Sequence, residues 1–351
     1  MQIRGGSSKG LFFDAKDLPT DETERDKIVL AAMEGVGQGD ARQIDGLGGG
    51  TSLTSKVAVV SRSKSEKADL DYLFLQVVVG KGKVSTTQTC GNILAGVVPF
   101  AIESGMIEVT QPTTTARVQM LNTGGVCEVV VQTPNCQVEY AGDAKVDGVP
   151  ATAAPIICHY LDTEGATCGA LLPTGKAKNN IDGIEITCID NGMPVVLLKA
   201  SDFGISGYET PTELDAHENV KKRLESIRQQ VGQMMHLGDV ENKTIPKMCL
   251  IAPPQYGGVL STRTFIPHVC HEAIGVLGAV SVATACLLRG SVAESVAVLP
   301  KGDNQGFSIE HPSGEFTVNL AHRFEGGRLI IEKSGVIRTA RLLSKGVVFI
   351  P

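Results

Sequence analysis

The sequence predicts an α+β fold of two similar lobes, each with a curved, mostly antiparallel sheet around a central buried helix. Short segments rich in β-branched residues and bounded by Gly, Pro, Asn or Asp dominate the chain, which is the pattern of strands. The segments Gly91–Ser104 and His271–Leu288 are instead apolar on almost every side, as helices are when protein surrounds them. They lie about half the chain length apart, so each half would contain one such helix.

The remaining elements follow from periodicity and turn chemistry. Helical spacing with a polar face predicts helices over Glu22–Glu34 and Pro211–Met235. Gly183 and the pair Gly124-Gly125 carry the turn chemistry of hairpins. The clearest strand patterns occur over Val57–Ser61, Tyr72–Val79, Arg117–Asn122, Cys127–Gln132, Ile184–Ile189 and Val195–Lys199.

The two apolar segments also suggest where one lobe ends and the next begins. Each segment follows a cysteine, Cys90 or Cys270, and each contains several small residues. We therefore expect an N-terminal lobe of residues 1–185 with a central helix over 91–104, and a C-terminal lobe of residues 186–351 with a central helix over 271–288. The tail Val336–Ile350 has strand character and could return to the first lobe.

Composition narrows the class of function. The net charge is -6 and the sequence pI is about 5.7, so a nucleic-acid partner is not expected. The basic run Lys221-Lys222-Arg223 lies in a mixed-charge helix and indicates a solvated surface. No apolar stretch of about 18 residues predicts a membrane span, and residues 1–15 lack a signal-peptide pattern. Nine scattered cysteines without a CxxC pair suit a reduced, cytoplasmic protein.

Two local patterns could carry chemistry. Cys90 stands at the start of a buried helix, where unpaired amides and the helix dipole favour a thiolate and can hold a carboxylate. Lys56 follows the glycines Gly48–Gly50 and several hydroxyl residues, a pattern that resembles an anion cradle. Partial desolvation ahead of an apolar strand would make its amine a usable general base. A structural cysteine and a surface lysine remain the alternatives.

Three further motifs suggest anion binding. Arg4 and Lys9 flank glycines and serines in RGGSSKG, which could hold a carboxylate or form a basic turn between strands. His268, Cys270 and His271 stand together after Arg263, but the partners of a tetrahedral zinc site have no obvious spacing, so we expect no metal. Arg263 and His268 near a helix start favour anion binding instead. HPSG, at residues 311–314, predicts a turn or a substrate contact.

Taken together, these motifs resemble the family of allylic polycarboxylate isomerases. The similarity rests on RGGSSKG, IDGLGGGTSLTSKVA, CGNILAGV, CIDNGMPVV, PHVCH, EHPSGEFTV and VIRTARLL, which run in order from residue 4 almost to the end of the chain. CGALLPTG, IPKMCL and GAVSVATACL are most similar to members that act on 4-oxalomesaconate. The family implies a diaminopimelate epimerase-like fold of two pseudo-symmetric lobes.

The resemblance assigns roles to individual positions. It places the catalytic acid/base pair on Lys56 and Cys90. Cys270 occupies the echo position of the second lobe, but His271 replaces the small residue that would follow, so both are candidates for a second-lobe acid or base. The substrate would be a small tricarboxylate, with no cofactor and no metal. The expected substrate-binding residues are Arg4, Ser8, Ser55, Gly91, Asn92, Arg263, His268, Ser313 and Gly314.

The resemblance leaves several functions open. The expected reaction is a keto–enol or 1,3-allylic proton shift in 4-oxalomesaconate during the breakdown of gallate and related aromatic acids. Methylaconitate or methylitaconate is the alternative substrate. A non-catalytic accessory protein of an aconitase-like enzyme and a phosphate-binding module built on Gly48–Gly50 are weaker alternatives. A homodimer through exposed sheet edges is expected by analogy, and no membrane partner is expected.

Overall fold

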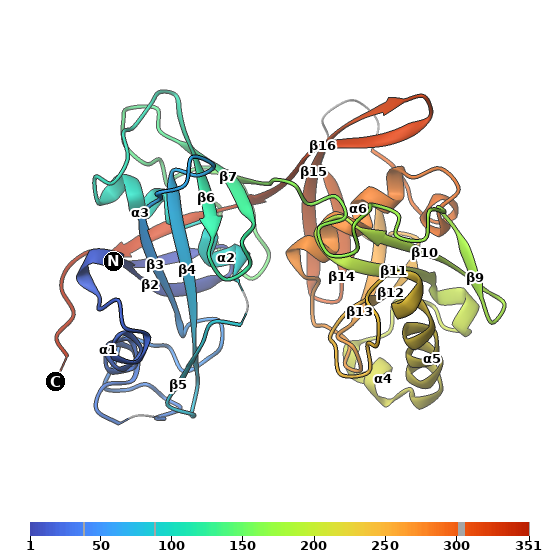
Figure 1. Cartoon of the computed structure of the whole chain (residues 1–351), viewed down its shortest axis with the longest axis horizontal. Coiled ribbons are helices and arrows are strands. Elements are labelled where there is room, and N and C mark those ends of the chain that lie inside the picture. Colours follow the sequence, from blue (N-terminus) through green and yellow to red (C-terminus); the bar gives the residue numbers. More distant parts are fainter. Residues whose placement is uncertain (38, 88, 301–305, 351) are drawn as a thin grey trace. The chain divides into compact units, whose positions relative to one another are not determined.

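The structure is a computed structural model that describes residues 1–37, 39–87, 89–300 and 306–350. The chain divides into two compact units (Figure 1). Unit 1 comprises Met1–Leu161 and Ile337–Pro351, and unit 2 comprises Asp162–Val336. Within the described ranges, no helix combines the length and the apolarity needed to cross a membrane.

The sheet of unit 1 closes on itself. Its strands are β1 (Gln2–Gly5), β2 (Ser8–Asp14), β3 (Lys56–Arg62), β4 (Leu70–Val78), β5 (Lys83–Ser85), β6 (Thr113–Met120), β7 (Val126–Gln132), β8 (Ile156–Tyr160) and β17 (Ala340–Ser344), joined by the end of β16 (Arg328–Arg338). Adjacent strands pair in the order β1–β2–β3–β4–β6–β7–β8. β8 then pairs with β16, and β17, one residue beyond β16, pairs with β1. The N-terminal strand and the C-terminal segment thereby complete one ring.

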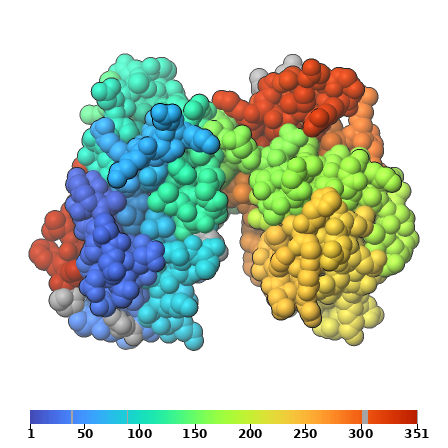
Figure 2. Space-filling view, viewed as in Figure 1, coloured from blue at the N-terminus to red at the C-terminus, as the bar shows by residue number. Residues whose placement is uncertain are grey.

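Helices occupy the two faces of this ring. α2 (Gly91–Leu94) and α3 (Val97–Glu103) pack against β1, β2, β3, β6 and β7, and most of their residues are buried (Figure 1). α1 (Glu22–Glu34) begins where the Asp21 side chain accepts a hydrogen bond from the Glu24 amide, a typical helix cap. Its apolar face covers the opposite side of β2, β3 and β4, and its polar face lies on the surface, in blue in Figure 2.

Unit 2 repeats the strand pairing of unit 1. Its strands are β9 (Asn179–Ile181), β10 (Ile184–Asp190), β11 (Pro194–Lys199), β12 (Lys247–Ala252), β13 (Leu260–Phe265), β14 (Phe307–His311), β15 (Gly314–Glu325) and β16. From β10 to β16 the neighbours pair antiparallel, parallel, antiparallel, parallel, antiparallel and antiparallel. From β1 to β8 the series is the same. The two units are therefore pseudo-symmetric, as the sequence predicts.

The helices of unit 2 follow the same plan. α4 (Pro211–Ala216) and α5 (Glu218–Met234) lie between β11 and β12 in the chain, as α1 lies between β2 and β3. α5 packs on one face of the sheet. α6 (Val276–Leu287) is the counterpart of α2 and α3 and contacts β10, β11, β14 and β15. Short 3-10 turns complete the elements: η1 (Ala15–Asp17) in unit 1, η2 (Ala200–Phe203) and η3 (Val292–Ser295) in unit 2.

The division into units differs from the predicted lobes. It falls after residue 161, whereas the sequence led us to expect a boundary after residue 185. The difference arises because β9 pairs with β10 and the Asp190 carboxylate accepts the amides of Thr167 and Cys168, which ties this segment to unit 2. Residues 337–351 belong to unit 1 rather than to the second lobe.

The predicted helices and strands are largely confirmed, with four corrections. The first central helix breaks at Gly96, where a β-carbon would meet the Phe12 ring at 2.6 Å. The second begins at Val276 rather than at His271, because residues 270–271 run alongside β13 as extended chain. The helix expected over Pro211–Met235 divides at His217, the cap between α4 and α5. The tail forms strands only as far as Ser344 among the described residues.

The segment around Asp190 and Asn191 also ties unit 2 together. The Asn191 side chain accepts a hydrogen bond from Thr163 at 2.5 Å and donates to Thr284 and Ser334 at 2.8 and 3.1 Å. Asn191 is fully buried, so its side chain depends on these three protein partners for its hydrogen bonds. The segment thereby links the end of β10 to α6 and β16.

Candidate active site

One face of β4 positions both predicted catalytic residues. Tyr72, Phe74 and Gln76 alternate along β4 and therefore point to the same face, the one that carries α2 and α3. The Tyr72 hydroxyl donates to the Cys90 carbonyl at 3.2 Å. Phe74 and Gln76 both contact the amine of Lys56. The strand thus links Lys56 to Cys90, although they lie far apart in the sequence.

Lys56 is the first residue of β3 and is 7% exposed. Its Nζ donates to Gln76 Oε1 at 2.7 Å and lies 5.0 Å from the centre of the Phe74 ring. The Gln76 amide is oriented by donating to the carbonyls of Ser52, Ser55 and Val77. This partner is a neutral amide, so the contact of Lys56 with Gln76 is a hydrogen bond and not an ion pair.

Cys90 lies at the start of α2, in an extended conformation and partly exposed. Its side chain makes no capping hydrogen bond. Burial and the neighbouring Cys90 raise the pKa of Tyr72 well above its usual value, so this hydroxyl stays a hydrogen-bond donor to the Cys90 carbonyl. Tyr72 thereby holds the main chain of Cys90, whose thiol forms no disulfide.

Glycines let the N-terminal motif approach this pair closely. A β-carbon on Gly5 or Gly6 would meet Asn92 at 2.3 or 2.1 Å, and one on Gly10 would meet the Lys56 carbonyl at 2.5 Å. The RGGSSKG segment therefore packs directly on the start of α2 and on β3. Asn92 donates from Nδ2 to the Ser7 hydroxyl at 3.2 Å.

Two predicted ligands in this segment differ in availability. Arg4 uses its Nη1 internally, donating to the Gly6 carbonyl at 2.9 Å and to the Thr339 hydroxyl at 2.9 Å. The Ser8 hydroxyl is buried and has no hydrogen-bond partner among the described residues. A buried polar group without a partner is costly, so Ser8 is the better candidate to meet a ligand.

The glycine-rich segment before Lys56 does not form the predicted anion cradle. The amides of Gly48, Gly49 and Gly50 donate instead to Met33, Thr54 and Gln43 at 3.0, 3.3 and 2.9 Å. The buried Gln43 also accepts from the Ser55 hydroxyl at 2.7 Å. Ser55 is therefore part of the loop's internal structure rather than a free substrate contact, and the phosphate-binding alternative loses its basis.

Two predicted ligands of unit 2 face the α4–α5 side of the sheet. Arg263 is 6% exposed, and its guanidinium donates to the carbonyls of Glu209 and Thr262 at 2.5 and 2.8 Å. His268 is exposed and lies 3.6 Å from the Glu225 carboxylate. The predicted anion site of Arg263 and His268 at a helix start is wrong in this respect, since α6 begins eight residues further on, at Val276, and the two side chains are turned to α4 and α5.

The two other candidates of this segment differ from each other. Burial and Asp215 raise the pKa of Cys270 to about 12, so its thiol stays protonated near neutral pH. Its amide donates to Asp215 at 2.7 Å. His271 points to the opposite face, and burial lowers the pKa of its imidazole. A second catalytic thiol is therefore not favoured, whereas His271 keeps a neutral, partly accessible ring.

The turn at residues 311–314 lies beside His271. Ser313 donates from its hydroxyl to the Glu272 carbonyl at 2.6 Å, and Gly314 opens β15 opposite His311. The structure thus brings Ser313 to Glu272, the residue after His271. Sequence reasoning missed Tyr72, Phe74 and Gln76, whose alternation along one strand was the available signal.

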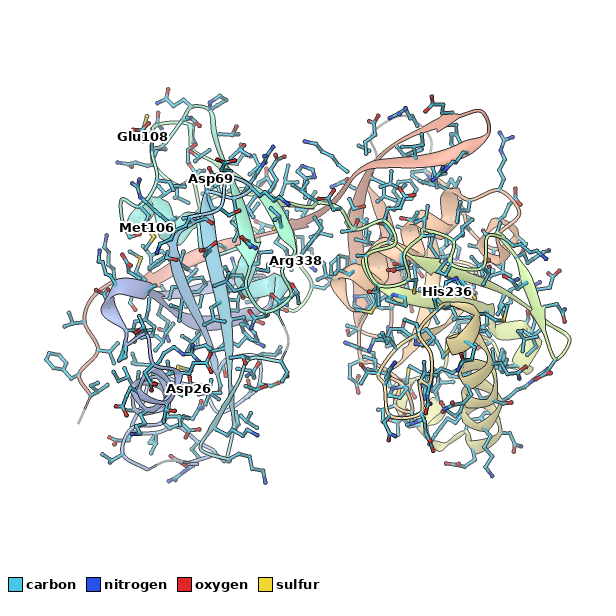
Figure 3. All side chains as sticks on the ribbon, in the orientation of Figure 1. Asp26, Asp69, Met106, Glu108, His236 and Arg338 are labelled. Atoms are coloured by element: carbon cyan, nitrogen blue, oxygen red, sulfur yellow. The ribbon has the colours of Figure 1, made fainter. Side chains whose placement is uncertain are left out.

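A separate groove in unit 1 has none of the predicted site residues. Figure 3 labels Asp69, Met106 and Glu108, which contribute to it. Its full lining is Arg62, Ser63, Ala68, Asp69, Met106, Ile107, Glu108, Thr115 and Ala116. Among the described residues, no group of three or more His, Cys, Asp or Glu is arranged to bind a metal ion.

Comparisons with known proteins agree with this architecture. The family model described as PrpF protein matches residues 1–351. The chain is 53% identical over 348 residues to a protein of Pseudomonas putida named 4-oxalomesaconate tautomerase, covering 99% of this chain and 94% of that protein. It is 52% identical over 350 residues to the (4E)-oxalomesaconate Delta-isomerase of a Novosphingobium species, covering 100% and 96%.

A solved structure extends the agreement to the fold. The crystal structure of a methylitaconate-delta-isomerase superposes with a TM-score of 0.86 at 30% identity, covering 98% of this chain and 93% of that one. Together with the repeated strand pairing, this likeness identifies the diaminopimelate epimerase-like fold.

Proposed function

Because the chain belongs to the PrpF protein family and is an enzyme of the isomerase class, we propose that it moves a proton within 4-oxalomesaconate. The observation that carries the proposal is that side chains on one face of β4 contact both residues: Gln76 accepts a hydrogen bond from the Lys56 amine, and Tyr72 donates one to the Cys90 carbonyl. The names of the two relatives that are just over half identical support this substrate.

The substrate itself supplies much of the chemistry. A proton next to a conjugated carbonyl and C=C bond is acidic, because its loss leaves a delocalised dienolate. One side chain removes this proton, and the other returns a proton to the far end of the three-atom system. The product is an isomer of the substrate, and the protein ends with one proton lost and one gained. The carbonyl acts as electron acceptor, so the proposed reaction uses no cofactor.

Binding groups for the substrate carboxylates lie around Cys90. The amides of Gly91 and Asn92 are in the first turn of α2, where a helix leaves its N–H groups without acceptors. The unpartnered hydroxyl of Ser8 belongs to the motif that packs on this turn. Such preorganised donors would also stabilise the negative charge that develops on the dienolate.

The remaining expectations stay proposals. We place the reaction in the breakdown of gallate and related aromatic acids, as the resemblance implies. The nine cysteines, none of them paired in a disulfide, support the expected cytoplasmic location. A homodimer stays a prediction.

The proposal is tested with purified, chelator-treated protein and 4-oxalomesaconate in deuterated water. We expect proton NMR to show deuterium entering the carbon skeleton and ultraviolet absorbance to show formation of the isomer. Methylaconitate and methylitaconate are measured in parallel. If well-folded protein isomerises methylaconitate or methylitaconate but not 4-oxalomesaconate, the alternative substrate is the correct one. Inactivity on all three, with a copurifying aconitase-like partner, would favour the accessory function.

Gln76 provides a test of how Lys56 is positioned. Gln76→Leu removes the acceptor at 2.7 Å from the amine, together with the hydrogen bonds that orient it. We expect kcat to fall by roughly 10–100-fold with little change in KM, because a misplaced general acid or base acts mainly on the chemical step. Gln119→Leu, on β6 of the same unit, is the control. Equal rates for Gln76→Leu and wild type would remove Gln76 from the mechanism.

A further inference from the structure

Lys247 of unit 2 repeats the position of Lys56 in unit 1. Each lysine is the first residue of its strand, β12 or β3, and each is paired in parallel to the preceding strand, with Val195 in β11 or Gly10 in β2. The equivalent strands have the same neighbours in the same directions. The sequence analysis did not single out Lys247, because its match to Lys56 depends on strand register.

Lys247 and His271 point to the same face of the sheet. Met248, Phe265 and Cys270 belong to one apolar cluster on the α5 side. Met248 pairs with Phe265, and Phe265 is bridged to Cys270, so three extended segments lie side by side. Because successive side chains alternate, Lys247 and His271, the neighbours of Met248 and Cys270, face away from α5. The positive charge of Lys247 lowers the pKa of His271 on this face.

The imidazole of His271 is held as a hydrogen-bond donor. Its Nδ1 accepts a hydrogen bond from the Ala273 amide at 2.8 Å. This places the proton of the neutral ring on Nε2, which can donate to a ligand. The Ser313 hydroxyl donates a hydrogen bond to the carbonyl of Glu272, the residue after His271.

Within the described ranges, no carboxylate forms an ion pair with Lys247 or His271. Lys247 is half-buried, and among the described residues no carboxylate lies within ion-pair distance of its amine. Burial alone lowers the pKa of Lys247 to about 8, and burial followed by Lys247 lowers the pKa of His271. Glu272 raises the pKa of His271, but Glu272 is exposed. A bound anion would supply the missing charge and accept from both groups.

We propose that Lys247 and His271 form a carboxylate-binding site in unit 2, on the sheet face opposite α5. The lysine supplies the charge and His271 Nε2 supplies a directed hydrogen bond. The ligand class is a small polycarboxylate, and its identification with the substrate of this enzyme rests on the proposed function.

The test uses propane-1,2,3-tricarboxylate, which has no C=C bond to shift, and calorimetric titration of the full chain. We expect Lys247→Gln to weaken binding at least ~10-fold, the effect of losing one charge-assisted contact. Lys247→Arg should stay within about threefold of wild type, because it keeps the charge. Lys222→Gln removes an exposed lysine of α5 and is the matched control. His271→Phe should weaken binding while the protein keeps its thermal midpoint.

The outcomes separate this site from the proposed reaction. Lys247→Gln that binds the probe as wild type does, or wild type that does not bind it at millimolar concentration, would overturn the site. Suppose that the wild type binds the probe, that binding depends on Lys247, and that none of the three substrates is isomerised. This result would support the carboxylate site and contradict the proposed function. If the carboxylate site and the proposed function are both correct, Lys247→Gln should raise KM for the substrate and the dissociation constant of the probe by about the same factor.

Discussion

Cys90→Ala is expected to lower turnover by about 10²–10⁴-fold while leaving the fold intact. This is the range contributed by a positioned general acid or base. The fold should tolerate the change because the Cys90 side chain is partly exposed and makes no capping bond, and because the contact from Tyr72 is to the main chain. Steady-state kinetics on 4-oxalomesaconate and a thermal melt together measure both parts. Cys136→Ala, which removes an exposed thiol of the same unit, is the control.

Lys56→Met should cause a loss of similar size, since it keeps the buried aliphatic chain and removes the amine. Comparing the two variants in deuterated water assigns their roles. A variant that still exchanges the substrate proton with solvent but makes no isomer retains the base and lacks the acid. Lys83→Met on β5 provides an exposed control lysine. Near wild-type rates in both Lys56→Met and Cys90→Ala would show that another pair carries the reaction.

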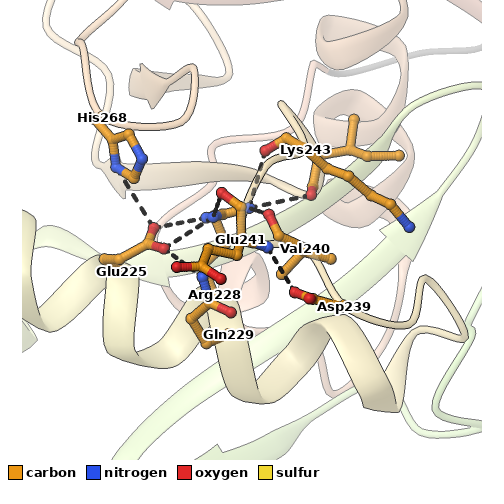
Figure 4. A network of polar contacts seen from close by, with 9 residues as sticks. Glu225, Arg228, Gln229, Asp239, Val240, Glu241, Lys243 and His268 are labelled. Carbon is orange, nitrogen blue, oxygen red and sulfur yellow. Dashed lines mark hydrogen bonds and ion pairs between the residues drawn. The ribbon is translucent and has the colours of Figure 1, made fainter.

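Arg228→Met is expected to destabilise unit 2 by about 3–5 kcal/mol, the usual cost of leaving a buried ion pair without one partner. Arg228 is fully buried, and two of its nitrogens bind the Glu225 carboxylate at 2.7 and 2.8 Å (Figure 4). Its guanidinium also donates to the carbonyls of Val240, Lys243 and Ile245, at 2.8, 3.1 and 3.3 Å. Methionine fills the space but removes every hydrogen bond that the guanidinium donates, while Glu225 keeps its contacts with Gln229 and His268.

The expected effect is measurable by calorimetry. For a unit of this size, each kcal/mol shifts the midpoint by about 2–4 °C, so the transition of unit 2 should fall by roughly 6–20 °C. Arg223→Met, on the exposed side of the same helix, should shift it by less than about 4 °C. A midpoint for Arg228→Met equal to that of the control would mean that the loop 240–245 is held by other contacts.

Local patterns predicted most of the elements but not how they meet. Glu22–Glu34 and the strands around Val57 and Val195 are read from periodicity within a few residues, so the sequence alone locates them. The start of α6 was misplaced because no side chain caps the helix, and only the pairing of Cys270 with Phe265 shows that the preceding chain is extended. Buried helices offer no polar face to mark their ends.

The site shows the same limit at the level of side chains. Lys56 and Cys90 stand in motifs that a single stretch of sequence reveals. Gln76 does not, because its role comes from lying opposite Lys56 on the next strand. Arg263 was expected to face a ligand, yet the alternation of β13 turns it toward α4. Which face a residue takes depends on register, and register depends on partners distant in the chain.

The ring of unit 1 also sets an order of events during synthesis. Among the described strands β1 is made first, and it pairs with β17, which is made last of them. Until then, β1 and β8 present unpaired edges, and such edges invite association with other chains. Unit 2 has its whole chain available before this point. The sheet of unit 1 therefore cannot close until β17 has been made. A nascent chain that stops short of residue 340 would leave the sheet that carries Lys56 with unpaired edges.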